Sequence, residues 1–295
     1  MDRTKILGCL TVALALAGCS HERRIVIGSK NFTEQQILGE LVAQHLEAHS
    51  KVPVVRKLGL GGTLLAHQAL VNGEIDLYPE YTGTGYTNVL KHAPVANARL
   101  VLDTLRSEYG SKFKLEWLDP LGFNNSFALA VRGEDARSRK LQTLSDAAKD
   151  PKGFALGAGY EFISRPDGLD MLNKSYAIHW TAPAKTMDLG LLYSALTQKQ
   201  VDLIAGSATD GVLAVLDAKV LDDDKQVFPP YQACFVVRSE TLSAVPELRA
   251  ALNALSGKVS TEAMRKMNYE VDGKHRQPAE VAREFLASAD RNLVK

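Results

Sequence analysis

Residues that could hold a metal ion are sparse in this sequence of 295 residues. Two of the seven histidines, His45 and His49, lie four residues apart on a predicted helix, a spacing that allows both rings to bind one metal. Glu47 lies midway between them rather than directly after the first histidine, as a His-Glu-x-x-His motif requires, and no third ligand is evident. We therefore predict a solvated helix face here and no metal site.

Motifs for nucleophilic or phosphate chemistry are equally weak. The sequence contains no Gly-x-Ser-x-Gly nucleophile elbow. The segment Gly59-Leu60-Gly61-Gly62 is not followed by the Lys-Ser/Thr pair with which a P-loop holds phosphates. We therefore predict that the protein is not an enzyme and uses no cofactor.

Cys19 is the cysteine with a predicted covalent role. It follows a basic start at Met1–Lys5, an apolar run at Ile6–Leu16 and the small residues Ala17 and Gly18, which together are typical of an export signal. The ending Leu-Ala-Gly-Cys resembles the lipobox of bacterial lipoproteins, which implies cleavage after residue 18 and a lipid on Cys19. The chain would then be anchored to a membrane of the cell envelope or periplasm rather than span it. An ordinary secretory signal with an incidental cysteine is the alternative.

Composition excludes further classes of protein. Apolar residues make up 45% of the chain, and 35 basic residues balance 34 acidic ones, which argues against disorder and against a nucleic-acid partner. Removal of residues 1–18 takes away two basic residues and one acidic residue, so the mature net charge is zero. Cys9 leaves with the signal, and Cys234 lies in an apolar run where a buried thiol without a disulfide is expected.

Short strands alternate with helices along the mature chain. The apolar spacing at residues 37–46 predicts an amphipathic helix, for which Thr33 is the predicted N-cap. This rhythm predicts an α/β fold with a mainly parallel sheet covered by helices on both faces. The predicted strands are 24–28, 52–55, 75–78, 154–157 and 201–205, and further helices begin at Thr63 and Pro166.

Two segments resemble each other at a distance of about a hundred residues. Residues 125–132 and 231–238 are both extended apolar runs that end in Val-Arg before a polar turn with an acidic residue. A pair of long strands at these positions is suited to cross from one lobe to another and back. Two unrelated strands are the alternative, because apolar runs that end in arginine are common.

Six short motifs follow one another along the mature chain: Ile27–Gln35, Ile75–Thr84, Gly122–Asn125, Arg165–Gly168, Ala208–Gly211 and Phe228–Tyr231. In this order they resemble the osmoprotectant-binding proteins, the glycine betaine, choline and carnitine components of ABC importers. The resemblance covers residues 24 to 290 and implies a two-lobed periplasmic-binding-protein-like fold of type II with two crossover hinge strands. It implies one discontinuous lobe of residues 19–125 plus 232–295 and a second lobe of residues 126–231.

The chemistry of a quaternary ammonium ligand limits which side chains can bind it. Such a cation has no N–H donor, so aromatic faces hold it by cation–π attraction, worth about 0.5–2 kcal/mol. The carboxylate of a betaine needs basic side chains, hydroxyls or backbone N–H groups instead. The family's cage has up to four tyrosines. By motif, Tyr81 and Tyr231 are kept, Phe127 takes the third place without a hydroxyl, and Ser207 leaves the fourth without a ring.

Four further residues match family positions that contact the cage or the ligand carboxylate: Lys30, Thr84, Asn125 and Arg165. Plain alternatives exist for the whole set. The rings are also compatible with core packing, the small polar residues with turns, and the two basic residues with the solvated surface. Because one ring of four is missing, we expect weakened glycine betaine binding, or a larger or different ligand over Ser207.

The sequence thus predicts a lipid-anchored, monomeric binding protein that captures a small zwitterionic or cationic solute and docks on ABC permease subunits. Closure about the crossover strands would bury the ligand. The same scaffold is also compatible with another small solute, such as an amino acid, or with a role as a sensor subunit.

Overall fold

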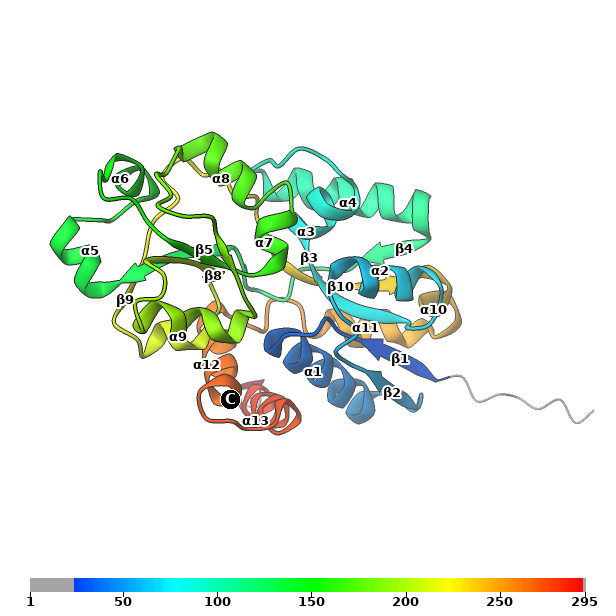
Figure 1. The fold of residues 1–295 in the computed structure, drawn as a ribbon. Helices are drawn as coiled ribbons and strands as arrows, with labels where there is room; N and C mark the ends of the chain where they lie inside the picture. The colour runs from blue at the N-terminus through cyan, green and yellow to red at the C-terminus, as the bar shows by residue number, and fades with distance from the viewer. Residues whose placement is uncertain (1–23, 294–295) are drawn as a thin grey trace, which may run out of the picture.

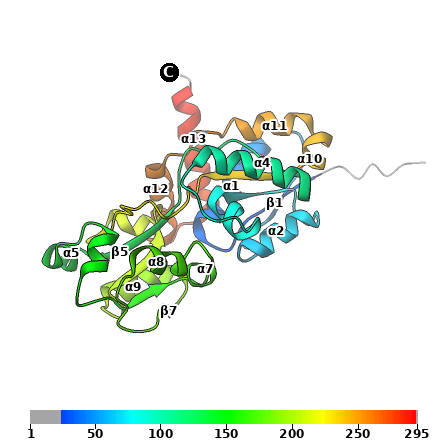
Figure 2. The same cartoon turned by 90° about the horizontal axis from the view of Figure 1, so that it is seen from above.

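Strands and helices alternate along residues 24–293, the part of the chain that the computed structural model describes (Figure 1). The predicted signal and Cys19 lie outside these residues. The strands form two five-stranded sheets that lie side by side, each with its own helices, and the view from above shows the same division (Figure 2). The predicted two-lobed α/β fold is confirmed. No helix within residues 24–293 has the length and apolar character needed to cross a membrane.

The first sheet has the strand order β2-β1-β3-β10-β4. β1 (Ile25–Gly28) is parallel to β2 (Val54–Lys57) and β3 (Leu77–Tyr81), and β10 (Ala233–Arg238) is antiparallel to β3 and β4 (Leu115–Trp117). Its helical elements are α1 (Thr33–His49), α2 (Thr63–Val71), α3 (Thr82–Thr84), η1 (Gly85–Val89), α4 (Ala98–Phe113), α10 (Ser239–Ala244), α11 (Pro246–Asn253), α12 (Thr261–Asp272) and α13 (Pro278–Leu293).

The second sheet has the order β7-β6-β8-β5-β9. β6 (Leu156–Ala158) is parallel to β7 (Lys185–Thr186) and β8 (Leu203–Ser207), and β5 (Phe127–Arg132) is antiparallel to β8 and β9 (Ala218–Val220). Its helical elements are α5 (Gly133–Arg139), α6 (Leu144–Lys149), α7 (Tyr160–Ser164), α8 (Leu169–Tyr176), η2 (Leu189–Leu191), α9 (Leu192–Thr197) and η3 (Gly211–Ala214).

The two segments that resemble each other are the crossover connections. One leads into β5 and the other into β10, and each of these strands takes the fourth place in its own sheet. Where the segments pass each other, Asn124 and Gln232 form an antiparallel bridge, and the Asn125 N–H donates to the Tyr231 carbonyl at 3.0 Å. The predicted pair of crossover strands is therefore confirmed.

α12 is a third link between the lobes. It packs against α1 of the first lobe and against η3 of the second (Figure 1). A Cβ at position 211 would lie 2.3 Å from the backbone nitrogen of Tyr269 in α12. Only glycine therefore lets η3 approach α12 this closely. The Arg265 guanidinium donates to the Ala208 carbonyl at 2.7 Å.

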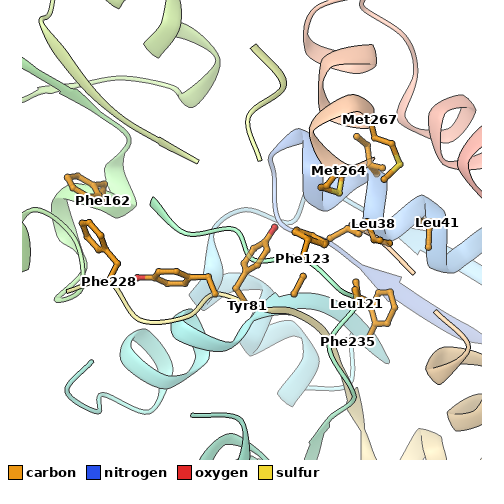
Figure 3. Packing of buried hydrophobic residues seen from close by; sticks show 14 of the residues in the cluster. Leu38, Leu41, Tyr81, Leu121, Phe123, Phe162, Phe228, Phe235, Met264 and Met267 are labelled. Carbon is orange, nitrogen blue, oxygen red and sulfur yellow. The ribbon is translucent and has the colours of Figure 1, made fainter. Parts of the chain in front are cut away.

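One hydrophobic core passes through the junction between the lobes. It runs from the apolar stripe of α1, whose members Leu38 and Leu41 are fully buried, to Phe162 of the second lobe (Figure 3). The amphipathic helix predicted at residues 37–46 is thus confirmed. Cys234 is completely buried, as predicted, and burial raises the pKa of its thiol.

Several local predictions are wrong. Each sheet combines parallel and antiparallel pairs rather than being mainly parallel, because the crossover strand runs against its neighbours. The third strand covers residues 77–81 instead of 75–78, and just before it the Asp76 carboxylate accepts the Val26 N–H at 2.7 Å. Pro79 is tolerated there because β1 pairs with β3 only at Leu77.

Three predictions about helices are also wrong. Thr33 is the first residue of α1 rather than its cap, and its hydroxyl donates to Asp272 at 2.5 Å. Pro166 precedes α8 by three residues, because Arg165–Gly168 forms a turn. His45 is buried, with Nε2 2.9 Å from the Ala251 carbonyl, so its predicted solvated position is wrong. Within residues 24–293 no three His, Cys, Asp or Glu side chains gather into a metal site.

Candidate functional site

Tyr81 ends β3 at the junction between the lobes, opposite Ala233 of β10. Its side chain is 4% exposed, and its hydroxyl donates to Glu34 Oε1 at 2.7 Å. Figure 3 shows the ring pointing out from the end of β3, between Phe123 and the residues around Phe228. A Cβ at Gly83, two residues on, would meet the Tyr231 ring at 2.6 Å, so glycine lets the two predicted cage residues approach.

Tyr231 lies on the returning crossover segment. The Tyr231 N–H donates to Asn124 Oδ1 at 2.6 Å, and its hydroxyl donates to Asp167 Oδ2 at 2.7 Å. Its ring meets the edge of Phe127 with a centroid distance of 5.4 Å. The structure thus brings two of the three predicted rings into direct contact.

Phe127 begins β5 and packs edge-on against Phe162 and Phe228, with centroid distances of 4.8 and 5.4 Å. Ser207 is its partner in the antiparallel pairing with β8. Directly opposite residues of an antiparallel pair point to the same face of the sheet, with Cβ atoms about 4.5–5.5 Å apart. A ring at position 207 would therefore stand beside Phe127.

Lys30 is buried rather than solvated. Its Nζ donates to Glu80 Oε1 at 2.6 Å and to the Thr63 hydroxyl at 3.4 Å, and only 2% of its side chain is exposed. The same ammonium lies 4.8 Å from the centroid of the Tyr81 ring. Lys30 therefore places a positive charge on the face of a predicted cage ring.

Arg165 places a positive charge near the other two predicted rings. Its guanidinium carbon lies 5.5 Å from the centroid of Phe127 and 5.7 Å from that of Tyr231. It donates to both oxygens of Asp167, at 2.8 and 2.5 Å. Burial by itself would raise the pKa of Asp167, but the guanidinium outweighs burial and holds the pKa below its usual value.

The two remaining predicted residues are also at the junction. Asn125 donates through Nδ2 to Glu34 Oε1 at 2.8 Å. Thr84 ends α3 and is 2% exposed. All eight predicted residues thus lie at or beside the ends of β3, β5 and β8 and the crossover segments, with basic groups and rings interleaved.

Sequence reasoning missed the acidic residues that hold this arrangement together. Glu34, Glu80 and Asp167 all stand inside the motifs quoted above, so the signal was present. The chemistry of a betaine does not point to them, because a carboxylate repels the carboxylate of the ligand. Asn268 of α12, which donates to Glu34 Oε2 at 3.0 Å, had no signal, since it comes from the far end of the chain.

Direct contacts hold the two lobes together around these residues. The Thr63 N–H of α2 donates to Glu161 Oε1 of α7 at 3.1 Å, and the Thr87 hydroxyl donates to Asp167 Oδ2 at 2.7 Å. Thr87 belongs to the first lobe and Asp167 to the second. The lobes are therefore closed on each other, which is the arrangement that excludes water from an enclosed solute.

A cavity of about 220 Å³ adjoins the rings, lined in part by Phe127, Ala208, Phe228 and Arg265. A larger cavity of about 290 Å³ lies between α4, β4 and α11, away from every predicted site residue. We associate the ring cluster and not the larger cavity with function, because only the former combines rings and buried basic groups from both lobes.

Two lobes, two crossover strands and a ring-lined junction define a two-lobed solute-binding protein. Residues 23–288 match the family described as the substrate-binding domain of ABC-type glycine betaine transport systems, and the chain belongs to this family. The resemblance inferred from the motifs is thus confirmed. The protein is a solute-binding component that acts outside the cytoplasm and is not an enzyme.

Individual relatives support the assignment. The chain is 38% identical over 266 residues to the ergothioneine transport permease/ergothioneine binding protein of Helicobacter pylori, which covers 90% of this chain and 47% of that protein. It thus spans about half the length of that relative. It is 35% identical to the carnitine transport binding protein of Listeria monocytogenes, covering 94% and 92%. A crystal structure of a glycine betaine/carnitine/choline ABC transporter protein superposes with a TM-score of 0.77 at 36% identity, covering 90% and 98%.

Proposed function

We propose that this protein captures a zwitterionic quaternary-ammonium solute between its lobes and delivers it to the permease subunits of an ABC importer. One observation carries the proposal. Three rings from different segments meet two buried basic groups, Lys30 and Arg165, at the lobe junction. Ring faces suit the ammonium end of a betaine, and basic groups suit its carboxylate.

The positions of the protein's own cations support a cation-binding role for these ring faces. Lys30 lies over Tyr81, and Arg165 lies beside Phe127 and Tyr231, at distances within the range of cation–π contacts. Both cations are also paired with buried carboxylates. A bound ammonium would take up ring faces, while the ligand carboxylate would share the two basic groups with Glu80 and Asp167. We assign Tyr81, Phe127 and Tyr231 to the cage, and Lys30, Thr84, Asn125 and Arg165 to its supporting polar contacts.

Calorimetric titration with glycine betaine, carnitine, choline, proline betaine and a set of common amino acids tests this function. We expect the betaines to bind and the primary amino acids not to bind. A Tyr231→Leu variant should lose at least tenfold in betaine affinity, because it removes one ring face. Binding of primary amino acids in preference to betaines would instead support the alternative of the same scaffold with another solute.

An uptake assay distinguishes a role in transport from a role in sensing. Cells that lack the protein should lose import of the bound solute, and the wild-type gene should restore it. Intact import without the protein would favour a sensor subunit.

We further propose that the first lobe comprises residues 19–125 plus 232–295, that the second comprises residues 126–231, and that the protein is a monomer.

We also propose a lipid anchor on Cys19, supported by the Leu-Ala-Gly-Cys ending of the export signal. Mass spectrometry of protein extracted from the cell envelope should find residues 1–18 removed and Cys19 carrying a diacylglyceryl group. A Cys19→Ser variant should be absent from the membrane fraction. An unmodified Cys19 in wild-type protein would contradict the anchor.

A further inference from the structure

α12 is attached to the second lobe through main-chain atoms of that lobe. Arg265 donates through Nε to the Ala208 carbonyl at 2.7 Å, and Asn268 donates through Nδ2 to the Thr209 carbonyl at 2.9 Å. Both carbonyls belong to the short segment between β8 and η3. Asn268 is 3% exposed and Thr209 is 1% exposed, so this contact is closed to solvent. Because main-chain acceptors cannot change rotamer, they fix α12 relative to the end of β8.

The segment after β8 is firmly part of the second lobe. The Asp210 carboxylate accepts hydrogen bonds from the Ser207 N–H and the Tyr193 hydroxyl, both at 2.8 Å, which ties η3 to β8 and α9. Val212 and Leu213 pack against the hydrophobic cluster that β5, β8 and α9 form. A rigid surface of the second lobe therefore meets α12.

α12 is held equally firmly on the first lobe. The Thr33 hydroxyl of α1 donates to Asp272 Oδ1 at 2.5 Å, and Asn268 Nδ2 also donates to Glu34 Oε2 of α1 at 3.0 Å. Met264 is completely buried in the hydrophobic core that contains the apolar stripe of α1 (Figure 3). α12 is therefore expected to move as part of the first lobe.

Main chain packs against main chain where α12 and η3 meet. A Cβ at position 211 would lie 2.6 Å from the Tyr269 Cα as well as 2.3 Å from the Tyr269 nitrogen. Together with the bridge between Asn124 and Gln232 in the crossover segments, this contact gives the lobes two attachment regions. Two fixed attachments leave one rotation, about the line that joins them.

The contacts on the opposite side of the junction are suited to separate and re-form. Figures 1 and 2 place α12 and α7 on opposite sides of the junction. Near α7, the Thr63 N–H donates to Glu161, whose side chain is 44% exposed, and the Thr87 hydroxyl donates to Asp167. Carboxylates and hydroxyls regain hydrogen bonds from water when such contacts separate. Because displacement grows with distance from the axis, this side should open furthest.

We propose that the contact between α12 and η3 is a fixed pivot, so that the lobes open by one rotation on the side of α2 and α7. Residues 208–211 stay in place on α12 in the open and the closed form, and the solute enters and leaves from the α7 side. This inference concerns the motion of the protein and holds for any solute that the closed lobes enclose.

Pairs of spin labels test the pivot by pulsed electron paramagnetic resonance on the mature protein. Leu65→Cys with Tyr160→Cys places labels on α2 and α7, at positions that are 64% and 76% exposed. Val215→Cys with Lys266→Cys places labels directly after η3 and on α12, at two exposed positions. Wild-type protein taken through the labelling is the background control, since Cys234 is completely buried.

The α2–α7 label distance should respond to opening, and the η3–α12 label distance should not. In the ligand-free protein, Asp167→Asn should lengthen the α2–α7 distance by more than about 2 Å, a domain motion, and leave the η3–α12 distance unchanged. Saturation with glycine betaine should shorten only the α2–α7 distance. Equal changes in both distances would overturn the pivot, and so would an α2–α7 distance that stays constant under both conditions. Because Asp167→Asn needs no ligand, the pivot is tested even if the proposed function is wrong.

Glycine substitutions test the packing at the pivot itself. Gly211→Ala places a methyl group against the main chain of Tyr269, so it should broaden the distance distribution of the η3–α12 labels. Gly110→Ala is the matched control, because a Cβ there meets nothing within 4 Å, and it should leave the distribution unchanged. If Gly211→Ala fails to fold, Arg265→Met replaces it by removing the hydrogen bond to Ala208. An unchanged distribution in Gly211→Ala and Arg265→Met would contradict the pivot.

Discussion

The two lobes share one strand arrangement but place their rings on different strands. In the first sheet Tyr81 ends β3 opposite Ala233 of the crossover strand, and in the second Ser207 ends β8 opposite Phe127. Ser207 therefore holds the position in the second lobe that Tyr81 holds in the first. The site thus combines two equivalent strand pairs, β3 with β10 and β8 with β5, and each pair supplies one ring.

The likeness extends to the arginines that end the crossover strands. Arg238 donates to the last two carbonyls of α2, and Arg132 donates to the carbonyls of Leu196 and Val201 around the end of α9. Each guanidinium ties the end of its crossover strand to the helix that precedes the third parallel strand of its sheet. The sequence similarity that ends in Val-Arg thus reflects one structural device used twice.

The basic groups of the site differ in how they are held. Lys30 is paired with Glu80 inside the first lobe. Arg165 is paired with Asp167, but Asp167 also accepts hydrogen bonds from Thr87 of the first lobe and from Tyr231 at the end of the returning crossover segment. The first half of the site is therefore preformed, whereas the second is completed by contact between the lobes.

The largest expected effect is on the free energy of unfolding, and it differs between these two ion pairs. Glu80→Gln removes the carboxylate that is hydrogen-bonded to the buried Lys30 ammonium and should lower the free energy of unfolding by about 3–5 kcal/mol. Asp167→Asn should cost less, about 1–3 kcal/mol, because Arg165 keeps Glu161 at 3.5 Å. Urea denaturation measures both losses.

Small-angle scattering sharpens the same comparison. Of these two variants, only Asp167→Asn should increase the radius of gyration of the ligand-free protein, since Asp167 joins the lobes and Glu80 does not. An equal increase in Glu80→Gln would show that the first pair also controls closure and would break the distinction.

The two crossover arginines come next in size. Arg132 is 11% exposed and pairs with Asp135 and Asp202, whereas Arg238 is 22% exposed and pairs with Glu240. Arg132→Met should therefore lower the free energy of unfolding by about 2–3 kcal/mol and Arg238→Met by about 1–2 kcal/mol. Guanidinium chloride titration should find this order, and the reverse order would contradict the expectation that the more buried arginine stabilises its lobe more.

Restoring the missing ring changes affinity rather than stability. Ser207→Tyr gives the second lobe its counterpart of Tyr81 and should tighten glycine betaine binding by about tenfold. Ser207→Ala is the matched control and should leave the affinity unchanged. No change in Ser207→Tyr, with wild-type binding already submicromolar, would contradict a depleted cage.

The smallest effect is a dependence on pH. Burial raises the pKa of Asp210 to about 6, opposed by the Ser207 N–H and the Tyr193 hydroxyl and supported by the charges of Glu34 and Asp272. A carboxyl with a higher pKa in the folded chain binds its proton more tightly there, so its contribution is present below about pH 4 and is lost as the pH rises through about 6. Urea denaturation between pH 4.5 and 7.5 should show a smaller loss for Asp210→Asn than for wild type. Parallel curves would contradict this.

Much of the fold followed from the sequence because it depends on local patterns. The stripe at residues 37–46, the buried thiol of Cys234 and the paired crossover segments are all set by apolar spacing or composition. Strand limits followed less well, as with β3, because a short apolar run does not fix where pairing with the neighbouring strands begins.

The candidate site was predicted less completely, because its parts depend on tertiary contacts. Rings at Tyr81 and Tyr231 follow from motifs, but burial of Lys30 depends on Glu80, which no local pattern couples to it. Asn268 reaches Glu34 from 234 residues away. Such contacts form only when α12 packs across both lobes.

We propose that the ring faces bind the positive charge of the solute, and one pair of ligands tests this directly. 3,3-Dimethylbutyrate has the shape and carboxylate of glycine betaine but carries carbon in place of the charged nitrogen. Calorimetry on the mature protein should find that glycine betaine binds about tenfold tighter or more than this neutral analogue. Equal affinity for the two would contradict the account.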